Sequence, residues 1–463
     1  MKRIKYYIAT LLASLLLLPS CSDSFFDINV DPNNPENVTP ALSLPSGISG
    51  TAYVLGGYYS ALGGFWSQQY AQAPAASQWL EWENYNLTED DFNRQFTSLY
   101  AGALTDYEYV RKTTTATADW KYYTIATLMQ AYTFQILADL YDEVPYTEAL
   151  KGAENLQPKY DKGDAVYASL LTRIDEAIAK DFTLSSVKTP GSEDLVFGGE
   201  IEKWIKFANT LKLKIYLRYV VKDPNKYKTQ IQALLTSNNF LTEDAKIISF
   251  KAEQTGYNPF YNTFVDRLTG NINANKNLMD SLNANNDPRK SKIFNASVTG
   301  ANFNAITTGD SKNLSGKTIK DFATPNVANV APVYFFTKEE VLFLIAEAQA
   351  RYGTAAAAET VYKSAISANL ESLGLAADAI VYPYNGLKSI IVQKWIAATN
   401  KNNIEAFFDY NRTGFPTMVE SLTSTFTAGQ SPKRLFFPDN ERKTNPNTPA
   451  KVALNKPVWW AIQ

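Results

Sequence analysis

Apolar side chains recur every three or four residues along much of the chain, which is the spacing of helices that bury one face. The clearest stretch runs from Tyr123 to Tyr141, where apolar residues occupy two stripes on different sides of one predicted helix. A helix that is apolar on both sides lies in the interior of a protein. Further helices are predicted near residues 170–178, 204–217, 227–235, 341–348, 361–365 and 387–408. The pattern therefore predicts an all-α protein.

Residues 337–374 indicate how these helices pair. Thr337 and Glu340 stand at the spacing of a capping box, in which hydroxyl and carboxylate satisfy free N–H groups at a helix start. Gly353 provides a stop, and Thr354 opens a second, alanine-rich helix. A helix, a short turn and a helix within about 34 residues are the tetratricopeptide format. We predict four such helix pairs, which together form a tetratricopeptide-like helical solenoid.

Two stretches interrupt the helical pattern. Residues 238–329 and, in part, 182–199 are rich in Asn, Thr, Gly and Pro and contain few apolar stripes. Loops of this length inside a compact protein are usually functional. Residues 50–463 are therefore expected to form a single domain, in which the solenoid carries an irregular, loop-rich ligand-binding region.

Residues 1–20 are typical of an export signal. Three basic residues precede an apolar stretch at 8–18 that is too short to span a bilayer. The only cysteine, Cys21, follows where cleavage is expected, and Leu18-Pro19-Ser20-Cys21 resembles a bacterial lipobox. Lipidation of Cys21 would anchor the mature protein, although a stray cysteine beside an ordinary signal is the alternative. Residues 21–49 would then form a lipid tether and entry segment, in which repeated prolines prevent regular structure.

Charge and composition exclude several classes of function. The 44 Lys and Arg residues balance 46 Asp and Glu without a long block of either sign, so no nucleic-acid partner is expected. The chain has no His, which removes a Ser-His-Asp triad and the commonest metal ligand. Paired carboxylates at Glu89-Asp90-Asp91 could serve a glycosidase, but helix capping or solvation explains them. We expect a protein that binds without catalysing a reaction, with no cofactor and no metal.

Aromatic side chains provide the candidate ligand contacts. The chain has 28 Tyr, 25 Phe and 8 Trp, and aromatics crowd residues 65–96 without a simple helical stripe. Sugar rings can stack on indole and phenol rings, whose polar edges also form hydrogen bonds. We therefore predict ligand contacts at Trp66, Trp79, Trp82 and Tyr85, with Tyr257 and Tyr261 forming the opposite wall of the same pocket. Packing of these rings in the interior is the alternative.

Other conspicuous side chains are expected to be structural. Four further tryptophans fall on helix stripes or near the C-terminal end and are expected in the core: Trp204, Trp395, Trp459 and Trp460. Arg289 and Arg412 are expected to anchor carbonyl and carboxylate groups, because one guanidinium satisfies several acceptors at once.

A series of short motifs runs through nearly the whole chain. They are DINVDPNNP at 27–35, DLYDEVPYTEA at 139–149, WIKFANTLK at 204–212, NDPR at 286–289, AEA at 346–348, QKW at 393–395, YNRTG at 410–414, RLFFP at 434–438 and the closing Trp459-Trp460. In this order, and behind a lipoprotein signal, they resemble the SusD/RagB family of nutrient-binding outer-membrane lipoproteins, closest to its SusD-like branch. Asp142-Glu143 departs from the Gly-Asp that members often carry before Val-Pro, which changes a turn.

The resemblance implies four tetratricopeptide-like units packed against a less regular ligand-binding region. It also implies a lipid-anchored, cell-surface position on the outer membrane and a SusC-like TonB-dependent transporter as the partner. Family members bind glycans or peptides, so the expected function is delivery of an oligosaccharide or peptide to that transporter, with a glycan preferred. The alternatives are a protein-interaction scaffold, a peptide-binding RagB-like receptor and a glycan-degrading lipoprotein. A binding protein of an ABC importer would require an α/β alternation that this sequence lacks.

Overall fold

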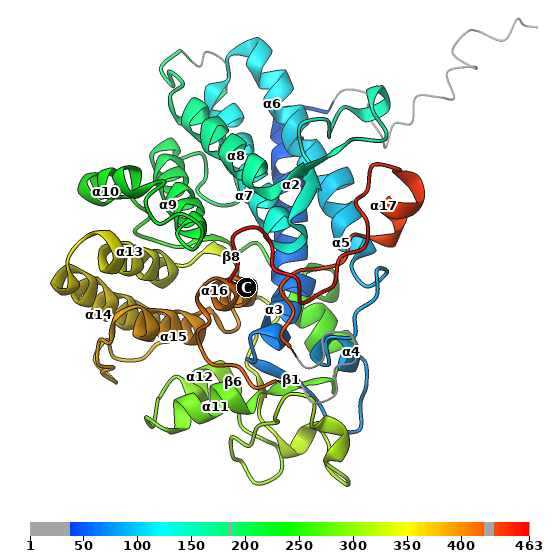
Figure 1. Cartoon of the computed structure of the whole chain (residues 1–463), viewed down its shortest axis with the longest axis vertical. Helices are drawn as coiled ribbons and strands as arrows, with labels where there is room; N and C mark the ends of the chain where they lie inside the picture. Colours follow the sequence, from blue (N-terminus) through cyan, green and yellow to red (C-terminus); the bar gives the residue numbers. More distant parts are fainter. Residues whose placement is uncertain (1–37, 185–187, 421–429, 463) are drawn as a thin grey trace, which may run out of the picture. The chain divides into compact units, whose positions relative to one another are not determined.

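The computed structural model describes residues 38–184, 188–420 and 430–462. Residues 40–463 form one compact unit, which contains all of the helices and strands described. Helices dominate this unit, and its strands are short antiparallel pairs, so the predicted all-α class is confirmed (Figure 1). The signal at 1–20 and the lipidation site Cys21 lie outside the described residues.

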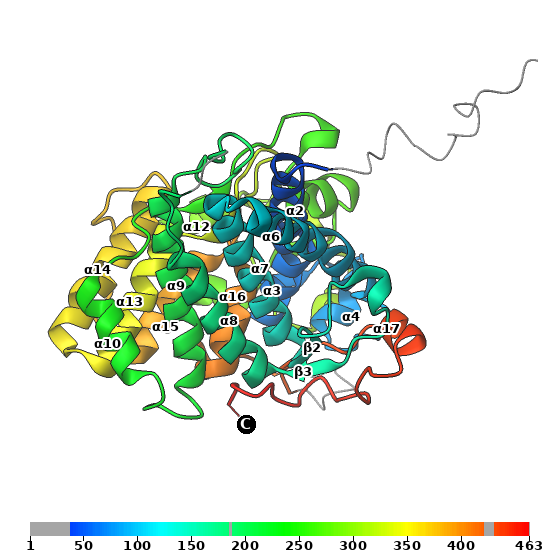
Figure 2. The ribbon, with the colours of Figure 1, turned by 90° about the horizontal axis from the view of Figure 1, so that it is seen from above.

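The helices predicted from the apolar stripes are all present. They are α7 (Trp120–Tyr141), α8 (Gly163–Ile178), α9 (Ile201–Tyr219), α10 (Lys228–Ser237), α13 (Lys338–Tyr352), α14 (Ala355–Ser372), α15 (Gly386–Ala398) and α16 (Asn403–Thr413). Helix α7 is apolar on both sides because it is an interior helix: α6 (Thr105–Thr117), α8 and α9 all pack on it. Seen from above, the helices follow one another from α14 through α13 and α9 to α7 (Figure 2).

The start of α13 contains half of the predicted capping box. The hydroxyl of Thr337 accepts a hydrogen bond from the backbone N–H of Glu340 at 3.1 Å, and Thr354 caps α14 in the same way through Ala357, at 3.2 Å. The carboxylate of Glu340 does not return to the helix start. It pairs instead with Lys214 at 2.9 Å, because a buried ammonium requires a counter-charge more than an N–H group does.

Helical structure begins before the expected domain boundary at residue 50. Helix α2 (Pro40–Val54) contains Pro45, so the prediction that prolines prevent regular structure up to residue 49 is wrong from Pro40 onward. Pro40 occupies the first helical position, where no intrahelical N–H bond is lost. Burial of Leu44 and Ile48 stabilises the rest of the helix, which packs on α6.

The insertion at 238–329 is loop-rich, as predicted, and lies below the solenoid in Figure 1. It contains α11 (Lys276–Asn283) and α12 (Lys290–Ile293) together with short strands. Two antiparallel strand pairs connect the insertion to the rest of the unit: β1 (Tyr70–Gln72) with β5 (Ile272–Ala274), and β4 (Ala245–Ile247) with β8 (Val333–Phe336). A third antiparallel pair, β6 (Phe294–Asn295) with β7 (Thr324–Pro325), lies within the insertion. The pair β2 (Glu143–Pro145) and β3 (Tyr160–Lys162) follows α7.

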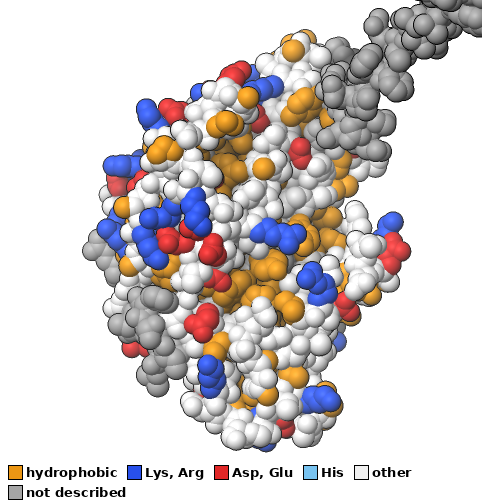
Figure 3. Space-filling model, turned by 90° about the vertical axis from the view of Figure 1, so that its right-hand side faces the viewer, with side chains coloured by type: hydrophobic (Ala, Val, Ile, Leu, Met, Phe, Trp, Pro, Cys, Tyr) orange, Lys and Arg blue, Asp and Glu red, His pale blue; other side chains and the backbone are white. Residues whose placement is uncertain are grey.

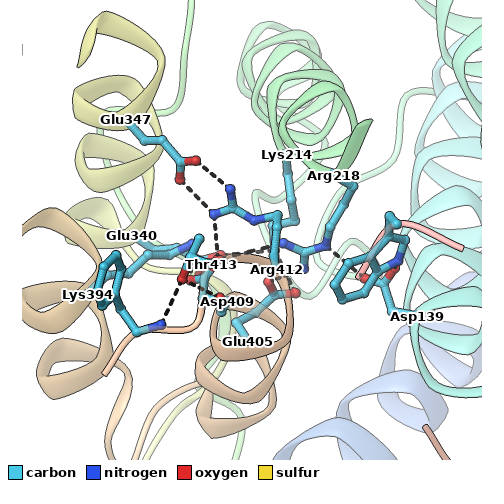
Figure 4. A network of polar contacts seen from close by, with 12 residues as sticks. Asp139, Lys214, Arg218, Glu340, Glu347, Lys394, Glu405, Asp409, Arg412 and Thr413 are labelled. Carbon is cyan, nitrogen blue, oxygen red and sulfur yellow. Dashed lines mark hydrogen bonds and ion pairs between the residues drawn. The ribbon is translucent and has the colours of Figure 1, made fainter. Parts of the chain in front are cut away.

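A buried network of charged side chains joins the solenoid helices (Figure 4). Its members come from α7, α9, α13, α15 and α16: Asp139, Lys214, Arg218, Glu340, Glu347, Lys394, Glu405, Asp409 and Arg412. Burial opposes ionisation of Glu347, but the charges of Arg412 and Arg351 outweigh it and hold the pKa of this carboxyl at about 2. The predicted anchoring role of Arg412 is therefore confirmed, since charged pairs in the interior fix one arrangement of the helices.

The other structural predictions concern Arg289 and the tryptophans. Arg289 is fully buried and donates hydrogen bonds to Asp287, Asn369 and Gln393, as an anchor does. The side chains of three tryptophans are in the core, as predicted: Trp204, Trp395 and Trp460. The fourth, Trp459, is only partly buried, and it lines a cavity.

Candidate ligand-binding site

The four rings predicted to form the main ligand site lie in the interior. Trp66 and Tyr85 are 0% exposed, and Trp79 and Trp82 are each 4% exposed. Trp66 donates from Nε1 to the carbonyl oxygen of Trp82 at 3.0 Å and packs edge-on against Phe407. A sugar needs an uncovered ring face, and protein atoms cover these faces. The predicted stacking surface is therefore not available on these four residues.

The insertion meets the tryptophans directly. The rings of Trp79 and Phe264 lie 5.0 Å apart between centroids, and those of Trp79 and Trp82 lie 4.7 Å apart. Tyr58, which is half-buried, contacts the same cluster at 5.5 Å from Phe264. The sequence correctly placed the two aromatic segments together, but their rings pack directly against each other instead of facing each other across a pocket. Edge-to-face and tilted ring contacts favour this packing over a water-filled gap.

Tyr257 and Tyr261 are the two predicted contacts that remain accessible. Both are half-buried, and their rings meet edge to face with centroids 5.1 Å apart and planes at 81°. The local sequence explains this pairing. The side chain of Asn258 accepts a hydrogen bond from the N–H of Tyr261 at 3.0 Å, and Pro259 follows at the first helical position. This cap leads into a π-helical turn, Tyr261–Arg267, and π-turns are frequent at functional sites.

The segment carrying these tyrosines is held firmly. The backbone N–H of Asn258 donates to the carbonyl of Asn329 at 2.7 Å, and its side-chain amide donates to the carbonyl of Ala331 at 2.9 Å. Phe260 and Phe264, which are buried, turn inward from the same segment. One side of the turn is therefore packed on the core, while Tyr257 and Tyr261 stay accessible to solvent. A pair of rings positioned in advance loses little entropy on binding.

Hydrophobic side chains also gather on the surface. Figure 3 looks onto the side that carries α4 (Leu80–Glu83), α5 (Asn93–Thr97) and α17 (Asp439–Thr444), and hydrophobic side chains line a hollow across its middle. Exposed hydrophobic groups collected in a hollow are typical of a binding surface.

Glu83 is the most perturbed carboxyl near the aromatic cluster. It is 0% exposed, and its Oε1 accepts a hydrogen bond from the N–H of Gln72 at 3.1 Å. Burial raises its pKa to about 8, so the group is mostly protonated at neutral pH. A carboxyl without solvent access cannot reach a ligand, so Glu83 is a structural residue.

The described part of the chain contains no cluster of three acidic or cysteine ligands and no membrane-spanning helix. No three acidic side chains or cysteines within residues 38–184, 188–420 and 430–462 converge closely enough to hold a metal ion. Among the helices described there, none combines the length and the apolar character needed to cross a membrane.

A family model with the description "Starch-binding associating with outer membrane", SusD-like_2, matches residues 32–438. The chain belongs to this SusD-like family. The resemblance carried by the sequence motifs is therefore confirmed. None of the curated proteins that were compared with the chain matches it.

Solved structures share the fold of this SusD-like protein. A SusD homologue from Bacteroides uniformis superposes with a TM-score of 0.77 at 22% identity, over 91% of this chain and 99% of the homologue. A chitin-binding SusD homologue from Flavobacterium johnsoniae gives 0.77 at 21% identity, over 90% and 98%. A further chitin-binding protein gives 0.76 at 23% identity, over 92% and 100%. At these identities the likeness establishes the fold alone.

The SusD-like protein also has a cavity that the sequence did not indicate. It has a volume of about 640 Å³ and lies beside the end of α16, with residues near 142, 222, 418–420, 430–433 and 455–459 on its walls. These segments are far apart in the chain, and none carries an apolar stripe or a recognised ligand motif. Only the tertiary fold brings them together.

Proposed function

We propose that this SusD-like protein is a cell-surface lipoprotein that binds a glycan and delivers it to a SusC-like TonB-dependent transporter. The observation that carries the glycan part is the accessible edge-to-face pair of Tyr257 and Tyr261, on a capped turn outside the solenoid. The family description, which names starch binding and the outer membrane, supports the same proposal. So does the chitin binding named for two proteins of the same fold.

Binding by this site requires no catalytic group. The exposed part of each phenol ring provides apolar area for the C–H face of a sugar, and the hydroxyl at its edge exchanges hydrogen bonds with sugar hydroxyls. Tyr257 and Tyr261 meet at 81°, so a sugar that stacks on one ring can reach the edge of the other. The ligand leaves unchanged, as transport of an intact nutrient requires.

The glycan claim is tested by isothermal titration of chitohexaose and maltohexaose into the mature protein and into Tyr257→Ala and Tyr261→Ala. Loss of a stacked ring is worth about 0.5–1.5 kcal/mol beyond the buried area, so we expect several-fold weaker binding. The melting temperature should hardly change, because both rings are half-buried. Tyr109→Ala, an exposed tyrosine on α6, is the control and should bind as the wild type does.

The glycan assignment fails if neither sugar binds the wild type, or if both tyrosine variants bind as tightly as the wild type. A scaffold function would be favoured instead if an unmodified peptide bound and neither sugar did.

Anchoring and partnership are tested separately in the native host. Replacing Cys21 with Ser should release the protein from the membrane fraction when the transporter is absent, since acyl chains provide nearly all of its membrane affinity. Mild detergent extraction of the wild type should recover a large TonB-dependent barrel with it. Membrane retention of Cys21→Ser without the partner, or recovery of the wild type only as a free monomer, would contradict the proposal.

A further inference from the structure

The cavity beside α16 is built from both charged and aromatic side chains. Its volume of about 640 Å³ is in the range of small-molecule sites. The lining residues on which the argument depends are Lys222, Tyr410, Ser431, Lys433, Lys456 and Trp459. None of them belongs to the tyrosine site proposed above.

Positive charge exceeds negative charge in this cavity. Among the described residues, no carboxylate lies within ion-pair distance of Lys222, Lys433 or Lys456. Two carboxylates also line the cavity, Asp142 and Glu420. Asp142 is already engaged, because its Oδ1 accepts the backbone N–H of Trp459 at 2.7 Å and its Oδ2 lies 3.5 Å from Arg434. None of the three ammonium groups therefore has a close ion-pair partner among the described residues, although Lys456 and Asp142 attract one another at longer range.

Lys433 is the ammonium most confined by its surroundings. It is half-buried, and its Nζ lies 5.0 Å from the ring centroid of Tyr410. Burial lowers the pKa of Lys433, since desolvation disfavours its charge. An anion bound in the cavity would restore the charge partner that this lysine lacks.

The remaining wall suits a hydroxylated ligand. Tyr410 and Trp459 are half-buried: the ring of Trp459 packs against Tyr167 and Tyr219 and only its remaining surface lines the cavity, where Ser431 offers a hydroxyl. The amide of Asn455 donates to Gln430 at 2.8 Å, which fixes two amide groups at the rim. Rings together with short polar groups are the combination that binds sugars.

The wall near Met418 is tied to the core of the protein. Gln68, which is fully buried, accepts from the N–H of Val419 at 2.9 Å and from the side-chain amide of Asn277 at 2.8 Å. Behind Ser431 lies Tyr85; burial raises the pKa of its phenol to about 12, and the Ser431 hydroxyl counteracts part of that shift. The part of the wall formed near Met418 and Ser431 is thus held in place by the core.

We propose that this cavity is a second ligand site and that it binds a saccharide bearing a carboxylate, such as a uronic acid unit. The unpaired lysines attract the carboxylate, and Tyr410 and Trp459 contact the sugar ring. The choice of a saccharide rests on the proposed function, whereas the preference for an anion rests on the cavity alone.

The test is isothermal titration of trigalacturonate, its methyl ester and chitohexaose into the full mature chain. The methyl ester has the same sugar backbone without the negative charge. We expect trigalacturonate to bind, the ester to bind about tenfold more weakly or worse, and added salt to weaken only the charged ligand. Lys433→Gln and Lys456→Gln should each weaken the binding of trigalacturonate by about tenfold and leave the binding of chitohexaose unchanged. Lys451→Gln, an exposed lysine outside the cavity, should change neither.

Lys456 is exposed, so Lys456→Gln should fold normally even if Lys433→Gln does not. The melting temperatures of both variants are measured as a check on folding. The proposal is overturned if trigalacturonate does not bind, if it binds no better than its ester, or if both lysine variants bind it normally. Binding of triaspartate, but not of trigalacturonate, in a Lys433-dependent way would assign the cavity to peptides and overturn the saccharide assignment. If chitohexaose and maltohexaose both fail to bind while trigalacturonate binds as expected, the assignment of the tyrosine pair is wrong and the assignment of the cavity is supported.

Discussion

Arg412 and Glu347 form a buried ion pair between α16 and α13, with Nη2 of the arginine 2.7 Å from Oε2 of the glutamate. The same guanidinium also contacts Asp409 at 2.9 Å. Removing one partner of a buried pair leaves an uncompensated charge, which costs about 3–5 kcal/mol. We expect Glu347→Gln to lower the free energy of unfolding by that amount in urea titrations at pH 7. The exposed pair Lys363–Glu359 gives the control, and Glu359→Gln should cost about 0.5 kcal/mol or less.

The same ion pair predicts that the stability of the folded protein falls at acidic pH. The folded pKa of Glu347 is about 2, below its ordinary value of 4.5, so its ionised form stabilises the folded state above pH 4.5. That contribution is lost as pH falls from 4.5 to about 2. The stability difference between wild type and Glu347→Gln should therefore shrink in this window. A difference that stays constant down to pH 2 would contradict the ion-pair account.

Glu83 predicts the opposite dependence on pH. Its folded pKa of about 8 lies above the ordinary 4.5, so its contribution is fully present below pH 4.5 and is lost as pH rises through 8. One such group changes stability by at most about 1.4 kcal/mol per pH unit. Measured against wild type by thermal melting, Glu83→Gln should gain relative stability between pH 5 and 8. Glu81→Gln, on the same short helix but exposed, should show no such trend.

Gly63 allows α3 (Ser60–Trp66) to touch α16. A Cβ at this position would lie 2.4 Å from the backbone N of Ile404, and backbone cannot move aside as a flexible side chain can. Gly63→Ala should therefore destabilise the protein by about 1–3 kcal/mol. Gly102 has no atom within 4 Å of the corresponding position, so Gly102→Ala should be neutral or slightly stabilising. Equal melting temperatures for the two variants would show that the helices can separate without cost.

Trp79 and Tyr261 distinguish packing from binding. Trp79 is 4% exposed, and truncating it to Ala should cost about 3–5 kcal/mol of stability. Tyr261 is half-buried, so Tyr261→Ala should affect glycan affinity much more than stability. Thermal melting and titration of both variants check this. If Trp79→Ala melts at the wild-type temperature and loses glycan binding, the tryptophans form the ligand site after all.

Much of the fold was predictable because local signals agree with one another. The double apolar stripe of α7 identified an interior helix, and Thr337 and Thr354 marked the starts of α13 and α14 correctly. Errors arose where tertiary contacts outweighed a local rule. Pro45 lies inside α2, because burial of the apolar face of this helix outweighs the cost of the proline. The carboxylate of Glu340 pairs with Lys214 instead of completing the capping box.

By itself, the sequence determined the helical class, the order of the helices, the family and the grouping of aromatic residues near 65–85 and 257–264. Spacing shows which residues share a helix face, and motif order shows kinship. Neither shows which ring faces are covered. The tertiary structure alone shows that Trp66, Trp79, Trp82 and Tyr85 are buried and that Tyr257 and Tyr261 are accessible. It alone also shows that Lys433 and Trp459 line the same cavity. Exposure depends on contacts between segments far apart in the chain, so no local pattern can determine it.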